Sequence, residues 1–204
     1  FLKTFSLRKL WRSSAELPRP RRRVNSNQDL RIKTGHSCPV FLLKCVVGLG
    51  QDCYHHSQMT QREITVRQLK ESDVSEWLRL RQLLWDETPE EEHRDEMLEI
   101  IDHPEFQLVI VADGGDGKLV GFLEVSIRPF AEDCETENVG YLEGWFVEPE
   151  LRRTGVGRNL VANAEQWARS RGCTEMASDA EVGNEDSIEA HRQLGYEEMS
   201  RLVH

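Results

Sequence analysis

The chain has 204 residues, of which 38% are hydrophobic and 30% charged, and its formal net charge is −10. This length and composition are typical of a soluble globular domain with a core of ordinary size. The longest apolar stretch, residues 39–49, is interrupted by Lys44 and is shorter than the roughly 18 residues that a membrane span needs. The five cysteines are odd in number and include no C-x-x-C pair, which argues against a disulfide framework or a zinc finger and favours a reducing compartment.

Charge divides the chain into two parts. Residues 1–58 contain 11 Lys and Arg against 3 Asp and Glu, whereas residues 59–204 contain 15 against 33. The first part is rich in Arg, Ser and Pro without a period of 2 or 3.6 residues, so we predict a basic N-terminal extension, disordered or not native to the domain, before a natural start at Met59. A basic nucleic-acid-binding arm is the alternative. The acidic part repels nucleic acid and attracts polycations, although its acidity can equally serve solubility.

The acidic part begins with alternating apolar and polar residues at 64–69, which predict a half-buried strand. A helix follows from Glu71, with an apolar face made by Val74, Trp77, Leu78, Leu80, Leu83 and Leu84. A capping residue, Thr88, then precedes Pro89 and acidic residues, which predicts a second helix to about residue 103.

The second half of this part alternates strands with helices. We predict strands at 106–112 and 119–127 joined by a Gly- and Asp-rich hairpin turn, then a polar loop at 131–138. The remaining elements are a strand at 139–147, a helix at 156–171 ended by Gly172, a strand at 173–179, a helix at 184–194 and a strand from 196. The order β-α-α-β-β-β-α-β-α-β predicts an α+β fold with a mixed sheet.

A basic loop joins the strand at 139–147 to the helix at 156–171. A strand that leads through a flexible loop to a helix N-terminus forms an anion site, because free backbone N–H groups and the helix dipole point the same way. Arg152, Arg153 and Arg158 add charge-assisted donors suited to phosphate. The loop fits neither common nucleotide-binding fingerprint, and an ordinary surface turn is the alternative reading.

The loop does match the pattern R-x-x-G-x-G, at Arg152, Gly155 and Gly157. This pattern resembles the coenzyme A pyrophosphate loop of the Gcn5-related N-acetyltransferase (GNAT) superfamily. A second superfamily landmark is an Asn followed by an aromatic four residues before Gly-Tyr, and Asn184, His191 and Gly195-Tyr196 stand at those places. The resemblance implies the α+β fold of the acyl-CoA N-acyltransferases, with a mostly antiparallel central sheet flanked by helices.

Several segments resemble one branch, the aminoglycoside 6′-N-acetyltransferases. The most distinctive are residues 172–179 and 191–198, within a resemblance that covers about 63–203. It implies transfer of acetyl from acetyl-CoA to the 6′-amino group of aminoglycosides, and hence antibiotic resistance, by a cytoplasmic homodimer without metal, nucleic acid or membrane. The chain departs from the branch in two ways. It looks clipped after the last strand, and Ser200 stands where some relatives carry an acid.

The resemblance also implies which residues hold the cofactor. The main chain of Trp145, Phe146 and Val147 is expected to pair with the pantetheine amides as an added strand would. The pyrophosphate is expected against Arg152, Arg153, Thr154, Gly155, Val156, Gly157 and Arg158. Asn184 is expected to cap its helix, to bind pantetheine, or both.

Acetylation of a polycationic amine needs a base and counter-ions, and carboxylates supply both. We predict Asp179 as the base and Glu143 as the substrate anchor, and strand alternation places Glu143 on the same side as Trp145 and Val147. His191 replaces the tyrosine that most of the superfamily uses as an acid; it would protonate the leaving thiolate or be structural.

Trp85 and Phe130 resemble the aromatic residues that line the substrate in this branch, and Trp85 fits a core position equally well. Two other functions remain open. One is acetylation of polyamines or protein N-termini, for which an acidic site is also suited. The other is a non-catalytic acyl-CoA-binding module, favoured if the clipped end leaves the active site incomplete.

Overall fold

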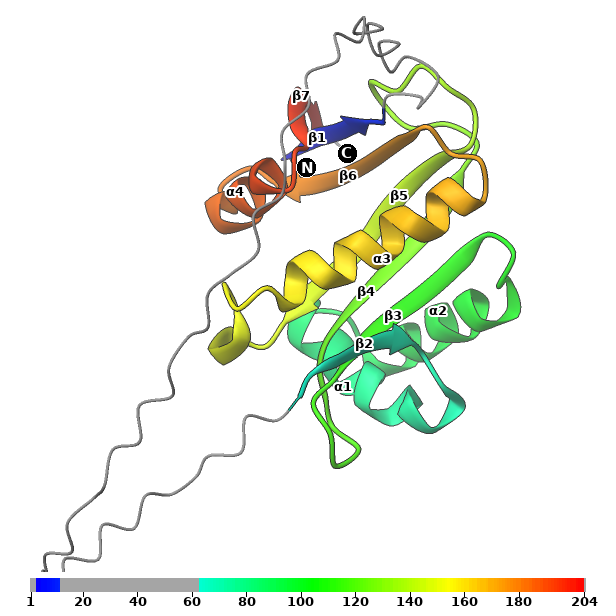
Figure 1. Ribbon diagram of the computed structural model, residues 1–204, viewed down its shortest axis with the longest axis vertical. Coiled ribbons are helices and arrows are strands. Elements are labelled where there is room, and N and C mark those ends of the chain that lie inside the picture. Colours follow the sequence, from blue (N-terminus) through cyan, green and yellow to red (C-terminus); the bar gives the residue numbers. More distant parts are fainter. Residues whose placement is uncertain (1–2, 12–62, 204) are drawn as a thin grey trace, which may run out of the picture. The chain divides into compact units, whose positions relative to one another are not determined.

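The computed structural model describes residues 3–11 and 63–203, and the structural statements below concern these residues. They form an α+β fold (Figure 1), as expected. The elements are β1 (Lys3–Leu10), β2 (Thr65–Gln68), η2 (Glu71–Asp73), α1 (Val74–Leu84), α2 (Glu90–Asp102), β3 (Gln107–Asp113), β4 (Leu119–Arg128), β5 (Val139–Val147), η3 (Pro149–Leu151), α3 (Val156–Ser170), β6 (Glu175–Glu181), α4 (Glu185–Gln193) and β7 (Glu197–Val203). From β2 to β7 the order of helices and strands is the predicted one.

The strands form one sheet in the order β2-β3-β4-β5-β6-β1-β7. The pairs are antiparallel except β5 with β6, which is parallel. A parallel pair needs a crossover connection, and α3 supplies it. The sheet is therefore mixed and mostly antiparallel, as the sequence predicts.

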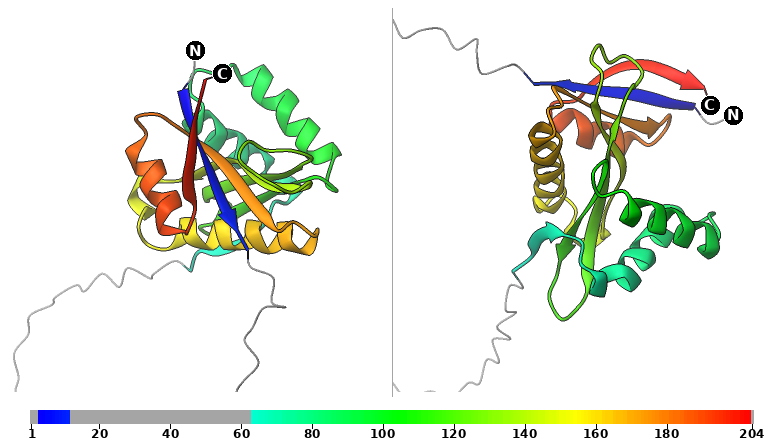
Figure 2. Two further views of the ribbon diagram at one scale, coloured as in Figure 1. Left: turned by 90° about the horizontal axis from the view of Figure 1, so that it is seen from above. Right: turned by 90° about the vertical axis from the view of Figure 1, so that its right-hand side faces the viewer.

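Helices cover both faces of the sheet (Figure 2). On one face, Leu160 and Ala164 of α3 and Ile188 of α4 share an apolar cluster with the strands. On the other, Trp77 of α1 and Met97 of α2 share a second cluster with β3 and β4. We call these the α3 face and the α1 face. Burial on both faces explains why the central strands β3, β4 and β5 are almost continuously apolar.

Strand β1 corrects the expectation that residues 1–58 lie outside the domain. Residues 3–10 form an inner strand between β6 and β7, antiparallel to both. Phe5 and Leu7 are 6% and 1% exposed within the larger core cluster. The positive charge that suggested a separate segment is complementary to the acidic body: Arg8 Nη1 lies 3.5 Å from Glu175 Oε1, and Lys9 Nζ lies 2.7 Å from a carboxylate of α3. The rest of the predicted extension, with Cys38, Cys45 and Cys53, falls outside the described residues.

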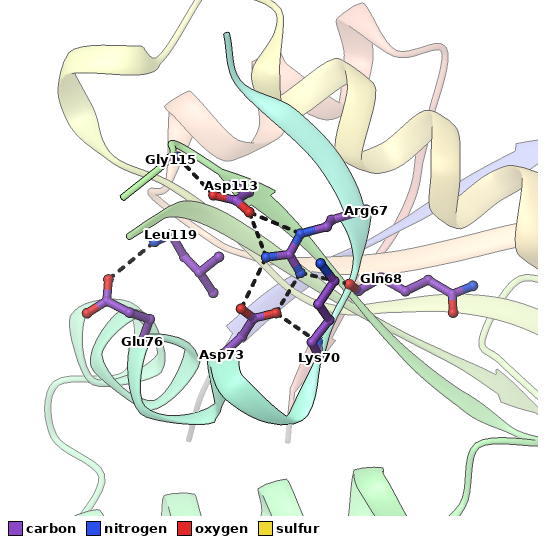
Figure 3. A network of polar contacts seen from close by, with 8 residues as sticks. All are labelled: Arg67, Gln68, Lys70, Asp73, Glu76, Asp113, Gly115 and Leu119. Atoms are coloured by element: carbon purple, nitrogen blue, oxygen red, sulfur yellow. Dashed lines mark hydrogen bonds and ion pairs between the residues drawn. The ribbon is translucent and has the colours of Figure 1, made fainter. Parts of the chain in front are cut away.

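The short strand β2 is anchored by a cluster of charged groups around Arg67 (Figure 3). The Arg67 guanidinium donates to both oxygens of Asp73, at 2.6 and 3.1 Å, and to Asp113 Oδ2, at 2.7 and 3.1 Å. Asp73 Oδ2 also accepts from the backbone N–H of Lys70 at 2.8 Å. The hydrogen bond from Arg67 is the main cause that holds the pKa of Asp73, and that of Asp113, below its usual value. One side chain thus joins β2 to the start of α1 and the end of β3.

Candidate active site

Strands β5 and β6 part beyond their first three paired positions. They pair at Gly140–Met176, Tyr141–Ala177 and Leu142–Ser178, and no further pairs join them although β5 continues to Val147 and β6 to Glu181. Backbone N–H and C=O groups on the facing edges, from residue 143 on β5 and residue 179 on β6, are therefore not used to pair these two strands. An extended ligand can satisfy such groups as an added strand does.

A β-bulge in β5 turns Glu143 to the α1 face. Gly144 pairs with Glu124 and Leu142 with Val125, so Glu143 is the extra residue between two adjacent positions of β4. The expectation that Glu143 points with Trp145 is wrong, because the bulge shifts the alternation by one residue. Leu142 and Trp145 pack in the cluster on the α3 face, whereas Glu143 contacts Ser126 and Arg128 of β4.

The bulge brings the two predicted carboxylates into one connected group. Glu143 accepts hydrogen bonds from Ser126 Oγ and from Nε and Nη2 of Arg128, the Nε bond being 2.9 Å long. The Arg128 guanidinium lies 3.5 Å from the centroid of the Tyr141 ring. Burial raises the pKa of Tyr141, and the neighbouring Asp179 carboxylate raises it further. We call Ser126, Arg128, Tyr141, Glu143 and Asp179 the acceptor cluster. The sequence predicts Glu143 and Asp179 as site residues but not the other three.

Trp85 lies on β5 beside this cluster. A Cβ on Gly144 would overlap Cη2 of Trp85, so only glycine at position 144 lets the indole lie against the strand. The ring also contacts Phe122 edge-on, with centroids 6.2 Å apart. Trp85 is half-buried and therefore fits both predicted roles, a core residue and a wall of the site. Phe130 lies two residues beyond Arg128 and is 66% exposed.

The basic loop leads into α3 through residues in left-handed conformations, Arg153 (φ 63°) and Gly155 (φ 97°). Arg152 folds back onto β5, where its Nε donates to the carbonyl of Val147 at 3.1 Å. Arg153, Thr154 and Arg158 are exposed. The first backbone N–H groups of α3 have no partner within the helix, so the loop presents amide donors next to exposed arginines, as an anion site requires.

Gly157 has a second reason to be glycine. An ideal Cβ there would lie 2.7 Å from Cζ2 of Trp145, so the first turn of α3 packs directly on this indole. The first reason, implied by the resemblance, is that a glycine without a Cβ lets a pyrophosphate approach the backbone closely. Trp145 therefore supports the loop from β5, and its partly buried indole packs against the core cluster of the α3 face.

His191 is buried on the α3 face, with 3% of its surface exposed. Its Nδ1 lies 2.8 Å from the carbonyl of Ser187, and its Nε2 lies 3.1 Å from Oγ of Ser178. Burial lowers the pKa of His191 below its usual value, so the ring is neutral near pH 7. Nδ1–H then donates to the carbonyl, and Nε2 accepts from the serine hydroxyl. This geometry favours the structural alternative for His191.

Asn184 caps α4 as predicted, since its Oδ1 accepts from the backbone N–H of Ser187 at 3.1 Å. No group of three His, Cys, Asp or Glu side chains suited to a metal ion occurs in residues 3–11 and 63–203. Within the same residues no helix has the length and apolar character to cross a membrane.

Comparison with known proteins identifies the class to which this fold and site belong. The family model described as "Acetyltransferase (GNAT) family" matches residues 77–196. The chain therefore belongs to the GNAT acetyltransferase family.

Within that family the chain is similar to aminoglycoside 6′-N-acetyltransferases. It is 43% identical over 139 residues to the aminoglycoside N(6′)-acetyltransferase type 1 of Klebsiella aerogenes, which covers 67% of this chain and 91% of that protein. The enzyme of Serratia marcescens is 39% identical over 132 residues, 64% of this chain and 90% of that protein. AAC(6′)-Iy, solved with the bisubstrate analogue CoA-S-monomethyl-acetylneamine, is 34% identical with a TM-score of 0.66 over 70% of this chain and 96% of that one.

Proposed function

We propose that this protein transfers the acetyl group of acetyl-CoA to the 6′-amino group of aminoglycosides. The observation that carries the proposal is the acceptor cluster, which places Glu143 and Asp179 together on the α1 face where β5 and β6 part. Two carboxylates next to the gap between these strands are suited to bind a polycationic amine. The names of the relatives and the coenzyme A analogue bound by AAC(6′)-Iy support the same reaction.

The cofactor half of the site consists of residues 145–158. The free edge of β5 would pair with the amides of pantetheine, and the N-terminal amides of α3 would hold the pyrophosphate together with Arg153 and Arg158. Arg152 braces the loop through the carbonyl of Val147. The residues present therefore fit acetyl-CoA as co-substrate.

Asp179 is our choice for the base. Glu143 already accepts hydrogen bonds from Arg128 and Ser126, so its oxygens have less capacity for a further proton. Asp179 lies beside the Tyr141 hydroxyl. Asp179 would take the proton of the 6′-ammonium, directly or through water. The free amine would then attack the thioester carbonyl and the C–S bond would break. The second proton of the nitrogen would pass to the departing thiolate, which leaves as the thiol of coenzyme A.

Glu143 and Trp85 are our choice for holding the acceptor. The Glu143 carboxylate is a counter-ion for a second ammonium group, and Arg128 keeps it in place. The half-buried indole of Trp85 offers an apolar wall next to it. His191, whose two ring nitrogens have partners in the protein, would hold α4 to β6.

A thiol-release assay tests the proposal. Full-length protein and acetyl-CoA are mixed with kanamycin-like compounds that carry a 6′-amine, matched compounds with a 6′-hydroxyl, spermidine and peptides. We expect release only with the 6′-amines. Release with spermidine or peptides alone would support the second enzymatic reading. Binding of coenzyme A without thiol release for any compound would instead indicate a non-catalytic binding module.

A homodimer and a cytoplasmic location stay predictions. Light scattering of the purified protein tests the first.

A further inference from the structure

Strand β1 contacts the candidate site through the face that carries Asp179. Ser6 is the register partner of Asp179, and Arg8 that of Ala177. Paired residues of antiparallel strands point to the same face, so Ser6, Arg8 and Asp179 share the α1 face with Tyr141. Leu7 and Lys9 point to the α3 face, where Leu7 joins the core and Lys9 bonds Glu165 and the carbonyl of Leu194.

The α1 face of β1 fixes the loop that joins β4 to β5. Arg8 Nη1 donates to the carbonyl of Asp133 at 2.8 Å, and Ser6 Oγ donates to the carbonyl of Glu132 at 3.4 Å. The same Arg8 nitrogen lies 3.5 Å from Glu175 Oε1. Glu175 is 1% exposed, and its other oxygen accepts from the backbone N–H groups of Glu135 and Thr136 at 3.0 and 2.7 Å. Arg8 and Glu175 together tie the loop at 131–136 to β1 and β6.

This loop connects β4 and β5, which carry four of the five residues of the acceptor cluster. Arg128 is the last residue of β4 and Phe130 follows it before the loop, whereas Tyr141 and Glu143 lie beyond the loop on β5. A shift of the loop would therefore act first on the strand ends that carry Arg128, Tyr141 and Glu143. The loop and first turn of α3, which form the cofactor half, make none of these contacts with Arg8.

We propose that β1 is a positioning element for the acceptor, and that Arg8, by fixing the loop at 131–136, helps to determine how the amine substrate is bound. The proposal rests on the proposed function, because it assigns the acceptor to the cluster around Glu143 and Asp179. Arg8 touches no substrate in this scheme and acts through the loop.

Two neighbouring cations of β1 make a matched pair for the test. Arg8→Met removes the donor to the loop, and Lys9→Met removes a cation of the same strand that bonds only elements on the α3 face. Calorimetric titration of the full-length variants with a kanamycin-like compound and, separately, with coenzyme A measures both halves of the site. A hydrogen bond from a charged group contributes enough for a change of about tenfold.

We expect Arg8→Met to weaken binding of the aminoglycoside about tenfold and to leave the affinity for coenzyme A unchanged. Lys9→Met should bind the aminoglycoside and coenzyme A with the affinities of the wild type, even if its melting temperature is lower. Arg8→Lys, which keeps a donor, should recover part of the loss and serves if Arg8→Met does not fold. Equal aminoglycoside affinity in wild type, Arg8→Met and Arg8→Lys would overturn the inference alone. A wild-type protein that binds coenzyme A but no aminoglycoside would overturn the proposed function and the inference together, whereas binding without turnover would overturn only the proposed reaction.

Discussion

Residues 145–158 run without interruption from β5 through the basic loop into α3, whereas the side chains expected to meet the acceptor come from α1, β4, β5 and β6. The cofactor half is thus held by local geometry: a strand, a tight loop with left-handed residues and a helix start. The acceptor half is held by contacts between residues far apart in sequence, such as Arg128 with Glu143 and Tyr141 with Asp179. Substitutions that alter the acceptor half can therefore leave the cofactor half intact. A family can change its substrates in this way while it keeps its acyl donor.

The largest expected effect is on the acceptor half. Asp179→Asn removes the proposed base but keeps the size of the side chain and a partner for the Tyr141 hydroxyl. Because positioned general bases contribute on the order of 10²–10⁴ in rate, we expect kcat to fall by about that factor with the KM for acetyl-CoA unchanged. Steady-state thiol-release kinetics measure both constants.

Glu181→Gln is the matched control, since Glu181 is an exposed carboxylate on the same strand. It should behave as wild type. Glu143→Gln should act mainly on the KM for the aminoglycoside, as expected of an anchor. If Asp179→Asn keeps wild-type turnover while Glu143→Gln loses it, the roles of the two carboxylates are reversed.

A smaller effect is expected from the cofactor half. Gly157→Val adds a Cβ that would lie only 2.7 Å from Cζ2 of Trp145. The first turn of α3 must therefore shift. Overpacking of this kind costs about 1–3 kcal/mol, and we expect the KM for acetyl-CoA to rise about tenfold while the KM for the aminoglycoside stays the same. Asn159→Val, on an exposed position of the same helix, controls for the added β-branched residue. Equal changes in both KM values would show that the two halves are not independent.

The Arg67 cluster lies in neither half, and its loss should change stability alone. Arg67→Met leaves Asp73 and Asp113 without their main partner, and we expect a loss of about 1–3 kcal/mol in unfolding free energy with kinetic constants unchanged. Because Arg67 lowers the pKa of both carboxyls in the folded protein, its contribution is complete above their unfolded pKa of about 4. The contribution is lost as the pH falls from that value through the lower pKa of the folded state.

Denaturant unfolding at a series of pH values measures this difference. The curves for wild type and Arg67→Met should be separated near pH 7 and should converge below about pH 4. A separation that persists at low pH would mean that Arg67 stabilises β2 through packing of its stem and not through the two carboxylates.

The same division explains what the sequence could predict. The order of elements from β2 to β7 and the loop Arg152–Arg158 follow from periodicity, capping residues and glycine spacing, which act over a few residues. The β-bulge that reorients Glu143 has no local signal, because it arises from how β4 and β5 pair. Arg128 and Tyr141 could have been suspected only once Glu143 was known to share their face.

The amino-terminal strand was missed for a different reason. Phe5 and Leu7 do alternate with polar residues, but their segment is short and lies in a stretch dominated by basic residues. Charge composition suggested a separate piece, whereas Arg8 and Lys9 are partners of buried carboxylates in the acidic body. A segment whose charge is opposite to that of the domain can therefore be bound to the domain as well as be separate from it.

The register between β1 and β7 has a consequence for chain order. Lys3 pairs with Val203 and Thr4 with Leu202, so the two strands relate to each other as the arms of a hairpin whose turn is missing. The sheet specifies which strands are neighbours and not which comes first. A polypeptide that carried β1 directly after β7, joined to it by a short hairpin turn, would therefore form the same strand order β2-β3-β4-β5-β6-β1-β7.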